Sequence, residues 1–329
     1  MPGEHAVGIV GTGSYLPEKV LNNHDFEQIV DTSDEWIFTR TGIKERRIAP
    51  PGTPTSDLCV EASKRALDMA GLKATDIDLI IIGTITPDYR FPSTACMLQH
   101  KLGCRNVGAF DVSAACSGFL YGLSVASHYL DNRNYKVALV LGAEVLSSVT
   151  DYEDRTSCIL FGDAAGAAIL HADAPHGHVI DTSMGSDGSV GDFMIIPSSG
   201  SAMPVCPETV EKKLHKMQIR GREVYKYVVQ KMGDVVTDLV TQNGCNVNDL
   251  AMIIPHQMNI RIIEGAARRM GTPLDKWYLN IERYGNTSAA TIPVALDEVV
   301  RQELIKRGDL VAMAAFGGGI TWAGGLVRW

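Results

Sequence analysis

The chain has 329 residues, and its 30 basic and 38 acidic side chains give a formal net charge of −8. This acidic balance excludes a general binder of nucleic acid or of anionic membranes, which needs basic residues to neutralise phosphates. Hydrophobic residues form 45% of the chain, which excludes a disordered protein, and no apolar run approaches the ~20 residues of a membrane-spanning helix. The first residues carry no basic segment typical of a signal peptide, so we expect a soluble, cytoplasmic protein.

A short glycine motif follows the first strand pattern. Gly11 and Gly13 fit the beginning of a dinucleotide-binding fingerprint, but Leu16 stands where the third glycine is required. We interpret this segment as a turn at the end of a strand. The motif therefore does not support a dehydrogenase.

Helix and strand patterns then alternate along the chain. Apolar residues at helical spacing predict a helix from Ser56, as its N-cap, to Gly71. The β-branched run at residues 77–83 predicts a buried strand. Helical spacing returns at residues 225–239 and ends at an Asn-Gly pair. This alternation predicts parallel strand pairing and an α/β fold.

The two halves of the chain resemble each other. The strand pattern at residues 76–83 matches residues 249–255, and the pattern at residues 135–142 matches residues 308–315. Both pairs are about 173 residues apart, and a third, weaker match occurs in the same order. Chance similarity explains any one match, but a common offset favours an internal duplication.

The predicted boundary between the halves lies in the Pro/Gly/His-rich stretch at residues 173–178. We therefore expect an N-terminal half at residues 1–175 and a C-terminal half at residues 176–329. Residues 182–207 are rich in Gly, Ser and Pro, which predicts a long irregular excursion. Such a long loop is usually functional or mobile.

One of the seven cysteines has the surroundings of a nucleophile. No Cys-x-x-Cys spacing occurs, so neither a zinc site nor a redox dithiol is indicated. Cys116, however, lies in a run of small residues between a strand pattern and a helix pattern, as in nucleophile elbows. The positive end of the helix dipole is expected to lower its pKa and favour the thiolate. A buried structural cysteine in a crowded turn stays open.

Further polar residues follow other strand patterns. His256 follows one strand, and Asn259 can cap the helix after it. Asn286 follows another predicted strand, and Phe316 precedes a glycine triplet that ends the last one. Each also fits an ordinary turn or cap. Together with Cys116 they are expected to meet where α/β proteins place their sites, with the asparagine amide suited to stabilise a negative oxygen.

These motifs together resemble β-ketoacyl-acyl-carrier-protein synthase III. The resemblance covers nearly the whole chain and rests on the segments 35–43, 113–118, 161–167, 255–259, 285–290, 316–319 and 326–329. It implies a thiolase-like α/β fold, with two duplicated halves forming a five-layered α-β-α-β-α arrangement.

The resemblance also implies a mechanism. Cys116 attacks the thioester of a short acyl-CoA and holds the acyl group, and malonyl-acyl-carrier protein then binds. His256 and Asn286 donate hydrogen bonds to the malonyl thioester carbonyl while carbon dioxide leaves, and the resulting carbanion attacks the acyl-cysteine. The backbone N–H groups of Cys116 and Gly318 form a second oxyanion hole, and Phe316 excludes water. Acyl-CoA is a substrate, and no cofactor or metal is implied.

Ligand and partner contacts are implied as well. Trp36 stacks on the adenine of CoA, and Phe91 enters the acyl pocket of a partner subunit, so a homodimer is expected. The resemblance places further residues at the nucleotide, the phosphopantetheine or the acidic carrier protein: Arg40, Arg155, Gly221, Lys226, Asn259 and Arg261.

Some residues near the expected tunnel differ from the family's usual forms, namely Met258, where a small alanine is common, Arg222 and Tyr225. These departures concern the substrate and the partner rather than the nucleophile.

Three other functions stay open. The first is a related enzyme of secondary metabolism that acts on malonyl-CoA or on a small-molecule acceptor. The second is a cysteine hydrolase that uses Cys116 and His256. The third is a non-catalytic duplicated binding domain.

Overall fold

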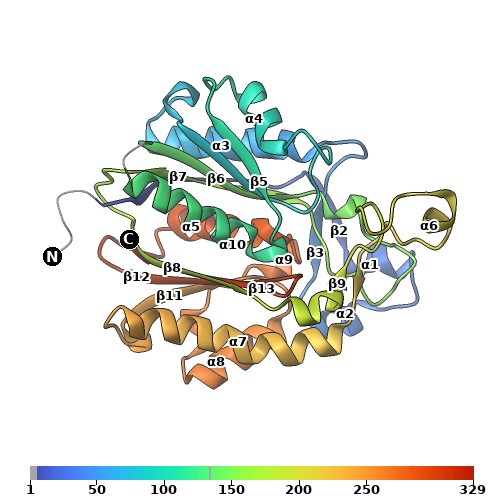
Figure 1. Cartoon of the computed structure of the whole chain (residues 1–329). Helices are drawn as coiled ribbons and strands as arrows, with labels where there is room; N and C mark the ends of the chain where they lie inside the picture. The colour runs from blue at the N-terminus through green and yellow to red at the C-terminus, as the bar shows by residue number, and fades with distance from the viewer. Residues whose placement is uncertain (1–5, 133–134) are drawn as a thin grey trace.

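The computed structural model describes residues 6–132 and 135–329, which form five layers of helices and sheets (Figure 1). One outer layer contains α3 (Thr55–Ala70) and α4 (Thr94–Leu102), and the opposite outer layer contains α7 (Gly221–Gln242) and α8 (Ile260–Met270). The central layer contains α5 (Gly118–Asp131) and α10 (Thr291–Arg301), which lie between the two sheets. The expected five-layered α/β fold is therefore confirmed.

The two sheet layers share one hydrogen-bonded strand order, β11-β12-β13-β8-β1-β7-β6-β4-β5, in which β1 pairs with β8 at Gly8 and His178. The strands of the first sheet are β1 (Gly8–Tyr15), β4 (Leu79–Gly83), β5 (Gly108–Val112), β6 (Val137–Glu144) and β7 (Ala164–His171). Those of the second sheet are β8 (His178–Ser186), β11 (Leu250–Pro255), β12 (Leu310–Gly317) and β13 (Thr321–Arg328).

Both sheets repeat one pairing pattern. In the first, β5, β4 and β6 are parallel, and β7 and β1 follow as antiparallel neighbours. In the second, β11 and β12 are parallel, β13 and β8 follow as antiparallel neighbours, and a single parallel bridge at Trp277 takes the place that β5 has in the first sheet. This repeat agrees with an internal duplication, and the division at residues 175 and 176 stays a prediction.

Shorter elements gather beside one end of the layers, on the right of Figure 1. The 182–207 excursion begins inside β8 and continues through a kinked 3-10 segment at Gly188–Phe193. The remaining short elements are β2 (Lys19–Asn22), α1 (Asn23–Glu27), α2 (Asp34–Thr41), β3 (Glu45–Ile48), β9 (Met194–Ile195), α6 (Pro207–Glu211), β10 (Gln218–Ile219) and α9 (Ile281–Tyr284).

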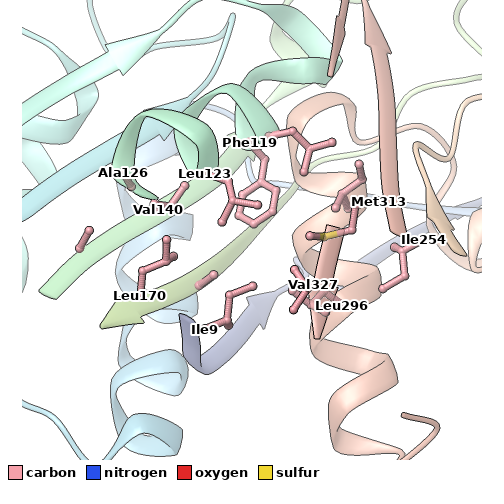
Figure 2. Packing of buried hydrophobic residues seen from close by; sticks show 14 of the residues in the cluster. Ile9, Phe119, Leu123, Ala126, Val140, Leu170, Ile254, Leu296, Met313 and Val327 are labelled. Atoms are coloured by element: carbon pink, nitrogen blue, oxygen red, sulfur yellow. The ribbon is translucent and has the colours of Figure 1, made fainter. Parts of the chain in front are cut away.

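The central core joins the two halves of the chain. Figure 2 shows Ile9 of β1 and Phe119 of α5 in one cluster with Met313 of β12, and none of the three is more than 1% exposed. Burying one such side chain contributes about 1.5–3 kcal/mol. The two halves therefore stabilise each other as one body.

Two local predictions near α3 are wrong. The helix begins at Thr55 after Pro54, and the Ser56 hydroxyl bonds to the Asp88 carboxylate instead of capping the helix. Gly11 and Gly13 lie inside β1 rather than in a turn. A Cβ atom at either position would come within 2.3 Å of a backbone oxygen of α3, so these glycines allow strand and helix to approach closely.

The long helix of the second half agrees with its prediction. α7 ends at Gln242, and Gly244 adopts a φ of 67°, a left-handed conformation suited to the end of a helix. It begins at Gly221, earlier than the pattern indicated, and Tyr225 lies outside its buried face at 39% exposure. Across residues 6–132 and 135–329, no helix is both long and apolar enough to span a bilayer.

Candidate active site

Cys116 lies in a tight connection between a strand and a helix, as the small residues around it predict. β5 ends at Val112, a 3-10 turn covers Ala115–Ser117, and α5 follows directly. Gly317 at the end of β12 packs against this turn, because a Cβ atom on it would come within 2.7 Å of the Cys116 backbone nitrogen. The end of β12 and its glycines therefore lie beside the Cys116 N–H.

The Cys116 thiol is not activated in the expected way. Its pKa is raised to about 12, mainly by burial; the hydrogen bond of the Ser288 hydroxyl lowers this pKa, and the Glu144 carboxylate raises it. The expectation that the helix N-terminus lowers this pKa is therefore wrong. The cause is the loss of solvent, which outweighs the helix dipole, so the resting group is a thiol.

His256 follows β11 directly and is only 1% exposed. Its Nδ1 lies 2.7 Å from the Thr291 hydroxyl, which itself donates to the Ser288 carbonyl oxygen at 3.0 Å. Because the Thr291 hydroxyl hydrogen is used in the bond to Ser288, the Thr291 oxygen accepts from His256 Nδ1–H, and His256 Nε2 carries the lone pair. Burial lowers the pKa of His256 to about 3, so the ring is neutral, and Nε2 has no hydrogen-bond partner in the described structure.

Asn286 does not end a strand, contrary to its prediction. It follows α9 and Gly285, whose φ is 64°, and only a single bridge pairs it with Phe161. The backbone is nevertheless fixed, because Asn286 N–H donates to Leu160 O at 2.8 Å. The side-chain Oδ1 accepts from the Ser288 N–H at 2.8 Å, so the Nδ2 amide group is the part available to a ligand.

A buried arginine supports the segment that holds Asn286. Arg46 is 0% exposed, its guanidinium lies 4.6 Å from the Phe26 ring centroid, and it donates to Ile159 O and to Asn23 Oδ1. Burial lowers its pKa to about 9, so it stays charged at neutral pH. Arg46 thus fixes the residue next to Leu160, which receives the Asn286 N–H.

Replacing Arg46 with alanine is expected to lower the free energy of unfolding by about 3 kcal/mol, because two buried acceptors lose their donor and a cavity forms. Lys44→Ala is the control, since Lys44 is a neighbouring exposed cation paired with Glu282, and should cost less than about 1 kcal/mol. Denaturant unfolding of both variants measures the difference. Equal losses would contradict this role of Arg46.

A cavity of about 330 Å³ lies against Cys116, Asn286, Ser288 and Gly318. Its remaining wall is mostly apolar and includes Ile85, Leu146, Met194, Ile195, Ile196, Met217 and Ile219. His256 is not a lining residue and joins the group through Thr291. Such a cavity suits a short apolar chain attached to Cys116.

A path leads from this cavity to the surface. A second cavity of about 240 Å³ shares Leu160, Ile219 and Met258 with the first. It opens toward a surface hollow of about 760 Å³ lined by Arg40, Gly221, Arg222, Tyr225, Lys226, Asn259 and Arg261. The departures noted at Met258, Arg222 and Tyr225 thus lie along this path.

Most of the expected ligand-contact residues lie on the same path. The Trp36 ring lines the second cavity, with the Arg40 and Arg155 guanidinium groups 4.4 and 5.0 Å from its centroid. Asn259 caps α8 through the Arg261 N–H, as predicted, and also donates to Arg40 O. This cationic entrance suits a phosphorylated ligand.

Phe91 lies away from this path. Its side chain is 86% exposed, and that of Tyr89 nearby is 58% exposed. Neither residue lines the cavity at Cys116. Exposed aromatic side chains on one loop are typical of a contact surface.

Three residues that position this site were not among the site residues predicted from the sequence. Ser288, Thr291 and Glu144 connect the candidate residues; Ser288 lies in the 285–290 segment without having been assigned a role, and Thr291 and Glu144 lie outside the segments on which the resemblance rests. No group of three or more His, Cys, Asp or Glu side chains could hold a metal ion within the part of the chain that the structure describes.

The architecture and the buried cysteine, histidine and asparagine define an acyl-transferring condensing enzyme of the thiolase fold. A crystal structure of 3-oxoacyl-[acyl-carrier-protein] synthase III from Aquifex aeolicus VF5 matches with a TM-score of 0.90 and 43% identity, covering 98% of this chain and 100% of the other. The priming β-ketosynthase from the R1128 polyketide biosynthetic pathway matches with a TM-score of 0.91 and 33% identity, covering 99% and 97%.

Sequence comparisons give the family. Models of 3-oxoacyl-[acyl-carrier-protein (ACP)] synthase III and of its C-terminal part match residues 110–188 and 240–329. The β-ketoacyl-[acyl-carrier-protein] synthase III of Caldanaerobacter subterraneus subsp. tengcongensis is 51% identical over 325 residues, and that of Desulfitobacterium hafniense strain DCB-2 is 48% identical over 324, each covering 98% of both chains. The chain belongs to the β-ketoacyl-[acyl-carrier-protein] synthase III family and is an acyltransferase that catalyses a condensation.

Proposed function

We propose that this synthase joins a short acyl group from acyl-CoA to malonyl-acyl-carrier protein, with Cys116, His256 and Asn286 as its catalytic residues. The observation that supports this most is the series of adjoining cavities, which share lining residues from a cationic surface hollow to an apolar cavity at Cys116. A phosphopantetheine arm has a charged end and a thioester end, and the path has matching ends.

In the first step, the Cys116 sulfur attacks the thioester carbon of the acyl-CoA. The new sulfur–carbon bond replaces the bond to CoA, and the CoA thiolate takes up a proton as it leaves. The carbonyl oxygen becomes negative in the transition state, and the backbone N–H groups of Cys116 and Gly318 would stabilise it. Phe316 is fully buried in β12 and would exclude water from this step.

In the second step, the malonyl thioester carbonyl lies against the Asn286 Nδ2 group and His256 Nε2. The Thr291 hydroxyl can accept from Nδ1–H or donate to Nδ1, so a bound carbonyl can select the form with Nε2–H. As carbon dioxide leaves, charge builds on this oxygen, and both donors stabilise it. The carbanion attacks the acyl carbon of the acyl-cysteine, the sulfur–carbon bond to Cys116 breaks as the new carbon–carbon bond forms, and the released Cys116 sulfur regains a proton. Because decarboxylation supplies the electron pair, the reaction needs no resident cofactor.

The remaining assignments belong to the same proposal. Trp36 would stack on the adenine, with Arg40 and Arg155 beside the nucleotide. Gly221, Lys226, Asn259 and Arg261 line the entrance hollow and would receive phosphopantetheine or the acidic carrier protein.

An exposed aromatic ring supports the proposed assembly. Phe91 would enter the acyl pocket of a second copy, which makes the working unit a homodimer. The proposal places this enzyme in the cytoplasm.

A second candidate keeps the chemistry and changes the acceptor. The matched priming β-ketosynthase of a polyketide pathway has the same fold at 33% identity, and Met258 lines both the cavity at Cys116 and the second cavity, where it would contact the acceptor. A synthase that uses malonyl-CoA or a small-molecule acceptor is therefore the rival to a fatty-acid-initiating enzyme.

Acceptor choice is tested by incubating the protein with a panel of short acyl-CoA primers and either malonyl-carrier protein or malonyl-CoA. We expect 3-ketoacyl-carrier protein and carbon dioxide, both detected by mass spectrometry. Turnover with malonyl-CoA, or with an amine or alcohol, but none with malonyl-carrier protein, would establish the rival. Release of free acid without a carbon–carbon bond would identify a hydrolase instead.

A further inference from the structure

A fully buried carboxylate lies next to the candidate nucleophile. Glu144 is the last residue of β6 and is 0% exposed. It forms no ion pair among the salt bridges of the described residues, and only hydroxyl and backbone N–H groups donate to it. A buried carboxylate without a countercharge is costly, so its retention calls for a role beyond packing.

The two oxygens of Glu144 have different surroundings. Oε2 accepts from the Thr84 hydroxyl, from Ile85 N–H, and from both the N–H and the hydroxyl of Thr86, at 2.6 to 3.1 Å. Oε1 accepts only a 3.2 Å contact from Ile85 N–H and a 3.0 Å bond from the Ser288 hydroxyl. Oε2 is thus saturated, and Oε1 is the oxygen able to receive a proton.

Ser288 connects this oxygen to the site. Ser288 and Cys116 line the same cavity, and the Ser288 hydroxyl donates to Glu144 Oε1 at 3.0 Å. A hydrogen bond of the same hydroxyl also lowers the pKa of the Cys116 thiol, against the effect of burial. The Ser288 N–H fixes the Asn286 amide, and its carbonyl accepts from Thr291. The backbone adopts a φ of 49°, which is uncommon for a residue other than glycine and is typical of functional sites.

We propose that Ser288 and Glu144 form a proton relay for Cys116, in which the thiol proton passes to the Ser288 oxygen while the Ser288 proton passes to Glu144 Oε1. This inference rests on the proposed acylation of Cys116. The relay then reverses to protonate the leaving CoA thiolate, so the carboxylate holds the proton only while the sulfur–acyl bond forms and the CoA–acyl bond breaks. Ser288 and Glu144 are positioning residues, since both act through Cys116.

The acidities of the surrounding groups agree with this route. Burial raises the pKa of Glu144 to about 7, while burial lowers the pKa of His256 to about 3, so the carboxylate is the stronger base. The ionisable groups that interact with Glu144 are the thiols of Cys116 and of Cys59 on α3, and burial raises the pKa of both. Glu144 is therefore expected to be the group that titrates near neutral pH.

The test is the single-turnover rate of Cys116 acylation by acyl-CoA, followed by intact mass at pH values on both sides of 7. In the natural protein the rate should rise with pH and level off above the Glu144 pKa, because only the ionised carboxylate accepts a proton. Glu144→Gln and Ser288→Ala should each slow acylation about 10²-fold and abolish this inflection. The double variant should be no slower than the slower single variant, because both remove one relay.

Asp297→Asn is the matched control. Asp297 is 2% exposed and accepts from Thr12 and Ser14, so the change removes another buried carboxylate and should leave the inflection in place. An unshifted inflection in Ser288→Ala, which keeps the N–H and carbonyl contacts, would overturn the relay even if Glu144→Gln does not fold. Absence of any acyl-Cys116 in the natural protein would instead overturn the proposed function.

Discussion

Replacement of Cys116 by serine is expected to remove the acyl-enzyme and to lower kcat/KM by about 10⁴-fold or more. The side chain is buried beside the glycines that end β12, so serine fits the same space. Its hydroxyl, however, is a much weaker acid and nucleophile than the thiol it replaces. Intact mass after incubation with acyl-CoA should show one acyl increment on the natural protein and none on the variant.

Cys59→Ser supplies the matched control for that experiment. Cys59 is a fully buried thiol on α3 whose pKa burial also raises, but it lies in the outer core rather than at the cavity. The variant should keep the acyl increment and the condensation. An acyl increment that survives in Cys116→Ser and disappears in Cys59→Ser would show that Cys59, and not Cys116, is the nucleophile.

Periodic patterns predicted the body of this fold well. The strand at residues 77–83 and the helix that ends before Gly244 have the expected type, because each depends on local spacing of apolar residues. Their ends shifted by a few residues, and the Ser56 cap was wrong because a tertiary contact with Asp88 takes the hydroxyl. The repeat of pairing in the two sheets agrees with the offset read from the sequence.

The candidate site was only partly predictable for a different reason. His256 directly follows β11, and Cys116 lies in the short turn between β5 and α5, so their positions could be inferred. Asn286 follows a short helix, and its place depends on a bridge to Phe161, far away in the chain. Glu144 and Ser288 are 144 residues apart and meet only through folding, so no local pattern indicates their contact.

The pKa of Cys116 likewise could not be predicted from the local sequence. Helix position is visible in a sequence and predicted a lowered pKa. Burial is a property of the assembled layers, and it raises that pKa to about 12. The direction of such a shift therefore depends on contacts that only the folded protein contains.

Asn286→Ala is expected to leave acylation of Cys116 nearly unchanged and to slow condensation by about 10²- to 10³-fold. In the proposed mechanism the amide Nδ2 would donate to the malonyl carbonyl, whereas the Cys116 and Gly318 N–H groups would donate to the acyl carbonyl. Asn286→Asp is the shape-matched companion, because its oxygen can still accept from Ser288 N–H while the other oxygen repels the developing negative charge. Both variants should therefore accumulate acyl-enzyme when malonyl-carrier protein is present, as intact mass would show. Equal loss of both half-reactions would mean that Asn286 maintains the shape of the site rather than stabilising the decarboxylation.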